Sequence, residues 1–241
     1  MRDGPVAPDP LRHGPVAPDP LRHGPVTPDL IAPRASLDSA RLYLVAPAHL
    51  AAGRLADLVG ELANAGVDLI QLREKSLEAR DVLRAGEPVA AACRDAGVPF
   101  IVNDRPDIAL ALGADGVHLG QNDLPVEVAR RVCPAAFVGL STHAPEEVHA
   151  VARADVDYFA VGPVEATPTK PGRPAAGIEL VRLASRTAGP PWFAIGGISA
   201  DSLERVLEAG ARRIVVVRAV TESGDPPAAA ARLRDMLEGT P

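Results

Sequence analysis

Short apolar segments alternate with longer mixed segments along most of this 241-residue chain. The short segments are apolar on both faces, which is typical of parallel strands covered by helices. They predict eight strands, at residues 42–46, 68–71, 100–102, 116–119, 137–140, 158–161, 192–195 and 213–217. The segments that follow them predict eight helices, at about residues 51–65, 77–95, 106–112, 125–132, 145–153, 177–187, 200–209 and 226–238.

Eight strand–helix units in roughly 200 residues predict a (β/α)₈ barrel, built as a single domain over residues 39–241. A doubly wound open sheet is the alternative, and it would normally carry a glycine-rich phosphate loop after its first strand. Here Ala46, Pro47 and Ala48 follow the first strand instead. In a barrel of this kind, the chemistry is expected on the loops at the carboxyl ends of the strands.

The first 38 residues differ from the rest of the chain. Residues 2–11, 12–21 and 22–31 form a ten-residue, proline-rich repeat without apolar periodicity. Such a segment has too little apolar surface to offset the entropy of ordering it, so we predict a disordered tail that is partly polyproline II. The tail is expected to be dispensable. A docking segment for a proline-binding partner and a mis-assigned start of the chain are the alternatives.

Composition narrows the class of protein. A formal net charge of −6 argues against a broad nucleic-acid-binding surface. Apolar runs are too short for a membrane span, and the first residues lack the apolar core of a secretory signal. Cys93 and Cys133 are expected to be reduced, buried thiols. We therefore expect a cytoplasmic protein without nucleic-acid or membrane partners, and the oligomeric state is left open.

Two acidic residues follow neighbouring predicted strands. Asp104 comes directly after the strand at 100–102, and Asp123 lies 19 residues later (123 − 104), in the loop after the strand at 116–119. Because the carboxyl ends of neighbouring parallel strands lie at the same edge, the two carboxylates are expected to meet. Mg²⁺ in proteins is usually bound by carboxylates together with phosphate oxygens of a ligand. The pair of acids therefore predicts a Mg²⁺ site. Two solvated loop acids are the alternative.

Lysine is rare in this chain. Of 25 lysines and arginines, only Lys75 and Lys170 are lysines, and both lie in loops after predicted strands. Lysine binds phosphate as a compact point charge, so the pair indicates an anionic ligand, with chance placement as the alternative. Gln71 and Arg73 alternate with Lys75 and are expected to face the barrel mouth with it.

Glycines and threonines mark two further loops at this edge. Gly196 and Gly197 precede a predicted helix, where a bare backbone offers N–H groups to an anion, although two glycines also make a tight turn. Thr167 and Thr169 either offer hydroxyls to a ligand or satisfy their own backbone.

These segments together resemble the thiamine-phosphate synthase family. The matching motifs are QLREK at 71–75, VND at 102–104, GADGVHLGQND at 113–123, GLSTH at 139–143, GPVEATPTK at 162–170 and AIGGI at 194–198. They occur in order at the ends of the predicted strands, and they cover the core without the tail. The resemblance implies a (β/α)₈ barrel that joins a hydroxymethylpyrimidine diphosphate to a thiazole phosphate with Mg²⁺, releasing pyrophosphate.

The resemblance also implies residue roles. The pyrimidine diphosphate would be contacted by Gln71, Arg73, Lys75, Asn103, Ser141 and Lys170, among which Arg73, Lys75, Ser141 and Lys170 would be catalytic. Mg²⁺ would be held by Asp104 and Asp123. The thiazole phosphate would be contacted by Thr167, Thr169, Gly197, Val217 and Arg218. His118 is either a structural residue of the barrel lining or a ligand.

Three positions depart from the common pattern of the family. Ala46-Pro47 stands where many relatives have an aspartate, Ala166 where proline is frequent, and Arg218 where serine is frequent. The first two bear on loop shape, whereas an arginine at 218 is compatible with a nearby phosphate.

Two other functions stay open on the sequence. One is a thiazole tautomerase-like paralogue of the same barrel family, and the other is a protein that binds thiamine precursors without catalysis. A nucleophile–base pair is not evident, because Ser141 and His143 share a loop without an orienting acid. The cations and carboxylates of the loops favour a reaction driven by electrostatic stabilisation of a leaving diphosphate.

Overall fold

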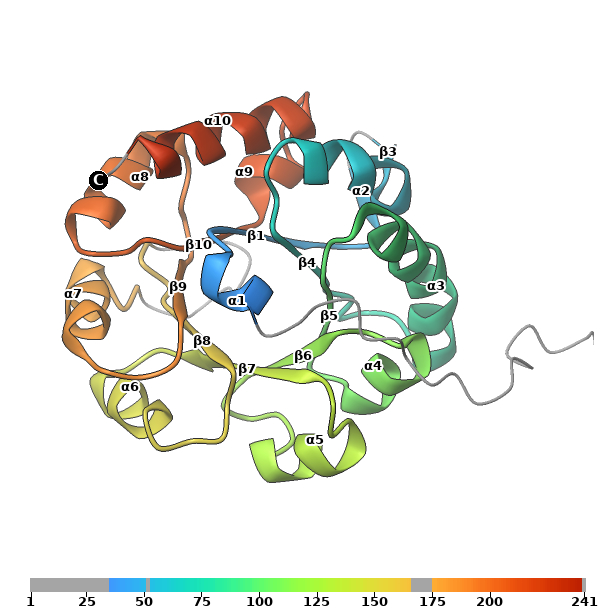
Figure 1. Cartoon of the computed structure of the whole chain (residues 1–241), viewed down its shortest axis with the longest axis horizontal. Helices are drawn as coiled ribbons and strands as arrows, with labels where there is room; N and C mark the ends of the chain where they lie inside the picture. Colours follow the sequence, from blue (N-terminus) through green and yellow to red (C-terminus); the bar gives the residue numbers. More distant parts are fainter. Residues whose placement is uncertain (1–34, 51–52, 166–174, 240–241) are drawn as a thin grey trace, which may run out of the picture.

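A closed barrel of eight parallel strands forms the centre of the molecule (Figure 1). The computed structural model describes residues 35–50, 53–165 and 175–239. The strands are β1 Leu42–Ala46, β4 Leu69–Leu72, β5 Phe100–Asn103, β6 Gly116–Leu119, β7 Phe137–Thr142, β8 Tyr158–Val161, β9 Trp192–Ile195 and β10 Ile214–Val216. They pair in the order β1-β10-β9-β8-β7-β6-β5-β4, and β4 closes the ring by pairing with β1. The predicted (β/α)₈ fold is confirmed.

Helices surround the barrel as an outer ring (Figure 1). They are α2 Leu55–Asn64, α3 Ala79–Ala96, α4 Pro106–Leu112, α5 Val126–Val132, α6 Pro145–Val151, α7 Ile178–Arg186, α8 Ala200–Glu208, α9 Arg218–Thr221 and α10 Pro226–Glu238. A further helix, α1 (Ala35–Ser39), lies across the centre of the ring. Among the helices of the described ranges, none is long and apolar enough to cross a membrane.

Alternation along the strands produces two separate hydrophobic cores. Residues such as Leu42, Leu44 and Phe159 point outward and pack in the core shared with the helices. Their neighbours Tyr43 and Tyr158 point inward and form the second core inside the barrel. In this inner core Tyr43, Tyr158 and Phe193 meet edge to face, with ring centroids 5.5–5.9 Å apart, a favourable aromatic geometry.

The N-terminal boundary of the folded part lies earlier than the sequence predicted. Residues 35–38, which the sequence pattern places in the tail, belong to α1. Leu37 is only 2% exposed and packs with Ala40 in the inner core, so it covers one end of the barrel interior. Burial of these apolar side chains offsets the cost of ordering a short helix. The repeat at residues 2–31 lies outside the described residues.

Two other elements differ from the sequence-based prediction. A two-stranded hairpin, β2 His49–Leu50 and β3 Gly53–Arg54, occupies the start of the helix predicted at 51–65. Gly53 has φ 144°, which a helix does not allow, so α2 begins at Leu55. The last strand is shorter than the predicted 213–217, because Val217 leaves the strand conformation and α9 starts at Arg218.

Leu37→Ala should lower the free energy of unfolding by about 2–4 kcal/mol, because it removes buried methyl groups and leaves a cavity inside the barrel. Urea unfolding followed by circular dichroism measures this loss. The control is Leu110→Ala on α4, where the side chain is 55% exposed. This control should change stability by less than about 0.5 kcal/mol.

Two shortened chains distinguish the contribution of α1 to stability from that of the repeat. A chain beginning at Ala35 should unfold at the same urea concentration as the full chain, whereas one beginning at Ser39 should lose at least as much stability as Leu37→Ala. Equal stability of the two shortened chains would show that α1 contributes nothing to the barrel.

Candidate active site

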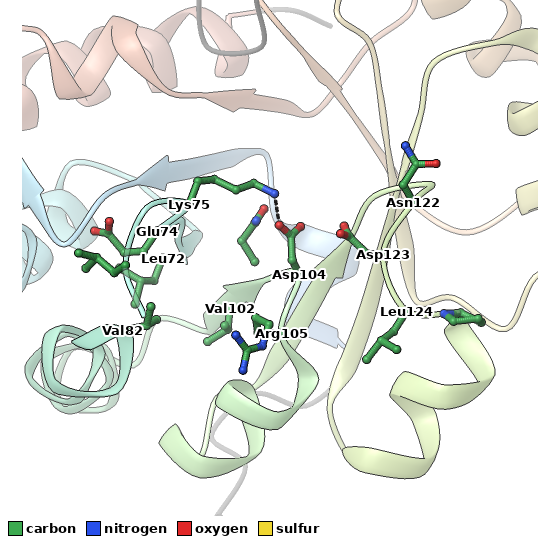
Figure 2. Close-up of a pocket in the computed structure, with 13 residues that line it drawn as sticks. Leu72, Glu74, Lys75, Val82, Val102, Asp104, Arg105, Asn122, Asp123 and Leu124 are labelled. Carbon is green, nitrogen blue, oxygen red and sulfur yellow. Dashed lines mark hydrogen bonds and ion pairs between the residues drawn. The ribbon is translucent and has the colours of Figure 1, made fainter. Parts of the chain in front are cut away.

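Asp104 and Asp123 come together at the carboxyl ends of β5 and β6, as the parallel topology predicted. The backbone N–H of Asp104 donates to the carbonyl of His118 on β6 at 2.8 Å, which fixes where the chain leaves β5. The loop after β6 turns back, and the carboxylate of Asp123 accepts from the N–H of Gly120 at 2.6 Å. Figure 2 shows the two carboxyl groups beside each other at the pocket.

The environment of Asp104 is unusual for a carboxylate. Burial raises its pKa, and the neighbouring carboxyl of Asp123 raises it further, while the ammonium of Lys75 opposes both effects. Lys75 forms an ion pair with Asp104 and reaches it across the pocket (Figure 2). Asp104 is also the one non-glycine residue with a positive φ, 64°, in the described ranges. A left-handed backbone at a partly buried acid that has a second carboxyl beside it is typical of a functional site.

A pocket of about 510 Å³ opens beside this pair. Leu72, Val102 and Leu124 supply apolar lining, while Lys75 and both acids supply charge. Asn103 also lines the pocket, and its buried amide Nδ2 has no hydrogen-bond partner among the described residues. A buried donor of this kind is costly unless a ligand oxygen accepts from it. The pocket therefore places the ammonium of Lys75 and the amide donor of Asn103 beside the carboxylates of Asp104 and Asp123.

The donor set fits a hard divalent cation. Two like charges in partial burial repel each other, and a cation between them removes both the repulsion and the desolvation cost. In the described part of the chain, clusters of three or more histidine, cysteine, aspartate or glutamate residues with metal-binding geometry are absent. Two carboxylates alone suit Mg²⁺, which is usually bound by one or two carboxylates together with phosphate oxygens and water.

The segment 71–75 divides between the barrel interior and its rim. Gln71 points into the barrel, where its amide Nε2 donates to the hydroxyl of Tyr43 at 2.5 Å. Beyond the end of β4, Glu74 accepts a hydrogen bond from the N–H of Ala48 at 2.6 Å. This bond holds the loop after β1 in place. Lys75 lies at the rim, and Arg73 lies between them, half-buried. Gln71, Arg73 and Lys75 thus lie at different depths from the interior to the rim, and of the three Lys75 lines the pocket.

Ser141 is paired with a different histidine from the one in its own loop. His118 Nε2 lies 2.9 Å from Ser141 Oγ, whereas His143 Nδ1 contacts the carbonyl of Gly162 at 2.5 Å. The other ring nitrogen of His118 faces the hydroxyl of Tyr158 at 3.2 Å, so a neutral phenol stands where a catalytic triad has its acid. The two tyrosines were not predicted as site residues, because aromatic residues on predicted strands are expected in the hydrophobic core.

Of the residues expected at the thiazole phosphate, the structure describes Gly197, Val217 and Arg218, which lie at or just before the starts of helices. Gly197 has φ 71°, and a Cβ there would lie 2.6 Å from the Cβ of Glu165, so both backbone and space require glycine. Val217 caps α9, and Arg218 pairs with Glu222 one turn later at 3.0 Å.

Thr167, Thr169 and Lys170, together with the departure at Ala166, lie outside the described residues. Described residues on both sides of this segment lie at the carboxyl end of β8. The N–H of Val164 donates to the carbonyl of Ile195 at 2.9 Å, and the N–H of Ala176 donates to that of Pro163 at 2.8 Å. Val164 and Ala176 therefore lie on the same rim of the barrel as Asp104.

Known proteins resemble this chain over the whole barrel. The model of the thiamine monophosphate synthase family matches residues 42–220. A thiamine-phosphate synthase of Mycobacterium bovis (strain BCG / Pasteur 1173P2) is 54% identical over 213 residues, which cover 83% of this chain and 96% of that protein. One from Thermus thermophilus is 58% identical over 175 residues, or 72% of this chain and 84% of that protein.

A solved structure agrees with the sequence relatives. Thiamine phosphate pyrophosphorylase from Pyrococcus furiosus superposes with a TM-score of 0.76 at 32% identity, covering 86% of this chain and 98% of that one. The matched region contains all eight strands of the barrel, both acids of the pocket and the Ser141–His118 pair. The resemblance found in the sequence motifs is thereby confirmed, and the chain belongs to the thiamine monophosphate synthase family.

Proposed function

We propose that this member of the family condenses 4-amino-2-methyl-5-(diphosphooxymethyl)pyrimidine with 4-methyl-5-(2-phosphooxyethyl)thiazole, giving thiamine phosphate and pyrophosphate. The observation that carries the proposal is the pair Asp104 and Asp123 with Lys75 at the barrel mouth. A diphosphate leaving group needs its negative charge neutralised, and this pocket combines a cation with a site suited to Mg²⁺.

Asp104 and Asp123 would hold Mg²⁺, which when bound supplies positive charge to the diphosphate oxygens. Lys75 then has a second role, because it now neutralises Asp104 and can turn to a phosphate oxygen once a metal ion takes its place. Asn103 supports the proposal, because its buried amide donor has no partner in the part of the chain that the structure describes. Arg73 and Lys170 would complete the diphosphate site.

The reacting groups need positioning more than acid–base chemistry. As the C–O bond to the diphosphate breaks, the aminopyrimidine ring delocalises the positive charge on its methylene carbon, and the thiazole nitrogen captures this carbon. Gln71 and Ser141 would orient the pyrimidine from the barrel interior. Gly197, Val217, Arg218, Thr167 and Thr169 would hold the thiazole phosphate. The chain would act through proximity and electrostatics.

The partners implied by this function are small molecules. Cys93 and Cys133 are buried and free, which suits a reducing compartment, so we also propose a cytoplasmic location. A tautomerase-like paralogue would not require the two acids or the diphosphate cations. The same assay separates the two functions, because only the condensation releases pyrophosphate.

Replacing either acid should remove activity without removing the fold. Asp104→Asn and Asp123→Asn should each lower kcat/KM by at least about 100-fold, a loss of roughly 2.7 kcal/mol or more in transition-state stabilisation. Asparagine suits position 104 because it tolerates the left-handed backbone there. The measurement is pyrophosphate release with both substrates at varied Mg²⁺ concentration.

The matched control for these variants is Asp107→Asn, an exposed acid on α4 that pairs with Arg105 outside the carboxylate pair. It should keep its rate and Mg²⁺ dependence. A near-normal rate with unchanged Mg²⁺ dependence in Asp104→Asn or Asp123→Asn would contradict the metal assignment.

Lys170 should not be replaceable by arginine. The chain uses arginine almost everywhere yet has lysine at 75 and 170, which indicates a slot shaped for one ammonium. Lys170→Ala and Lys170→Arg should both lower kcat as well as kcat/KM, by about 2–4 kcal/mol in activation free energy, if the charge acts on the departing diphosphate. Initial rates with each substrate varied in turn measure this. An arginine variant with full kcat would reduce Lys170 to an ordinary anion contact.

A further inference from the structure

A chain of buried hydrogen bonds crosses the interior of the barrel and joins Gln71 to Ser141. Gln71 Nε2 lies 2.5 Å from Tyr43 Oη, which lies 2.9 Å from Tyr158 Oη. Tyr158 Oη lies 3.2 Å from Nδ1 of His118, whose Nε2 lies 2.9 Å from Ser141 Oγ. The five side chains come from β4, β1, β8, β6 and β7, and all are buried.

The chain of hydrogen bonds has a direction. Gln71 Nε2 can only donate, so the hydroxyl of Tyr43 accepts this hydrogen bond. The Tyr43 hydroxyl then donates its own hydrogen bond to Tyr158. Tyr158 in turn donates to Nδ1 of His118. A neutral imidazole has one acceptor and one donor nitrogen, so Nε2 carries the ring proton and donates to Ser141 Oγ.

Burial stabilises this direction over its alternatives. Tyr43 is fully buried, and its hydroxyl meets Gln71 and Tyr158 among the described residues. With Gln71 Nε2 donating to Tyr43, a bond from Tyr158 to Tyr43 would leave the Tyr43 proton buried without an acceptor among the described residues, which is costly. Burial also raises the pKa of both tyrosines, so both hydroxyls keep their protons at neutral pH.

Packing holds the middle of the chain in place. Gly139 faces Tyr158 and His118 from β7, and a Cβ there would lie 2.2 Å from Tyr158 Cζ and 2.6 Å from His118 Nδ1. Because Gly139 has no side chain, the Tyr158 hydroxyl and the His118 ring have room to meet there. Phe193 packs edge to face on Tyr158, with centroids 5.8 Å apart. Packing therefore fixes where the Tyr158 hydroxyl and His118 Nδ1 lie, and so keeps this link of the chain in place.

We propose that Tyr43, Tyr158 and His118 are positioning residues that make Gln71 a hydrogen-bond acceptor and Ser141 a hydrogen-bond donor toward the pyrimidine. One N–H of Gln71 donates to Tyr43 inside the barrel, which leaves Oε1 to accept from the ligand, while Ser141 accepts from His118 and keeps its own proton for a ligand. A 4-aminopyrimidine offers a complementary amino donor and ring-nitrogen acceptors. A 4-oxopyrimidine offers an acceptor in place of the amino donor.

The inference rests on the proposed function, and it makes the hydrogen-bond chain the source of selectivity for the amino form. An unrestrained glutamine side chain could rotate its amide and accept either pyrimidine. If the amide of Gln71 turned over, Tyr43 would have to donate to Oε1 and every later hydrogen bond would reverse, so that Ser141 would donate to Nε2 of His118 and lose the proton it offers to a ligand. Selectivity against the oxo form thus depends on residues that need not touch the pyrimidine.

The test is a binding measurement, which is independent of turnover. Isothermal titration with Mg²⁺ and without the thiazole phosphate compares the diphosphates of the 4-amino and 4-oxo pyrimidines. The full-length protein should prefer the amino form. In Tyr43→Phe and in Tyr158→Phe the ratio of the two dissociation constants should fall by about tenfold, because one end of the chain is released.

Thr142→Val is the matched control. It removes a buried hydroxyl next to Ser141 that donates to the carbonyl of Ala160 at 3.0 Å, outside the chain of hydrogen bonds. Its preference for the amino form should stay unchanged. Circular dichroism first establishes which variants fold, and either tyrosine variant suffices, since the two interrupt the chain at different links.

The outcomes separate this inference from the proposed function. An unchanged preference in a folded tyrosine variant, or an equal fall in Thr142→Val, would overturn the inference while leaving the function intact. Failure of the full-length protein to bind either diphosphate would instead overturn the function. Nitrogen-15 NMR adds a direct reading, because His118 should carry its proton on Nε2, and a proton on Nδ1 would contradict the proposed direction.

Discussion

Closure of eight parallel strands into one barrel is the constraint on which the rest of this molecule depends. Parallel pairing brings every carboxyl end to one rim, so residues from distant parts of the sequence, such as Lys75, Asp104 and Asp123, share a pocket there. Closure also forces every second side chain into a narrow interior. That interior must be filled, and any polar group in it must find a partner.

The interior meets this requirement in two layers. Toward α1, apolar side chains such as Leu37, Leu69 and Ile101 fill the space without polar atoms. Toward the mouth, Gln71, His118 and Ser141 replace them and satisfy one another through two tyrosine hydroxyls. The tyrosines belong to both layers, because their rings pack in the apolar core and their hydroxyls join the polar one. The same packing that stabilises the barrel therefore orients the groups at the bottom of the site.

Much of the fold was predictable from the local sequence pattern. Where the prediction was wrong, the cause is also local. Strand β6 (Gly116–Leu119) and helix α4 (Pro106–Leu112) lie at the predicted residues, because turn-forming residues bound them on both sides. Helix α2 begins later than predicted, since Gly53 adopts a backbone conformation that the sequence pattern does not reveal. Helix α1 was missed because a single turn with one buried leucine leaves no periodicity to detect.

The fold class, the family motifs and the meeting of Asp104 with Asp123 were predictable from the sequence, because they follow from strand order and from the ends of parallel strands. The histidine that pairs with Ser141 was not predictable in this way. His143 is nearer in sequence, yet His118 is the partner, since the register of β6 beside β7 sets the inward neighbours. Tyr43 and Tyr158 are 115 residues apart, and their hydroxyls meet only because the barrel is closed. Contacts across a closed interior depend on register and side-chain direction together, which no local stretch of sequence contains.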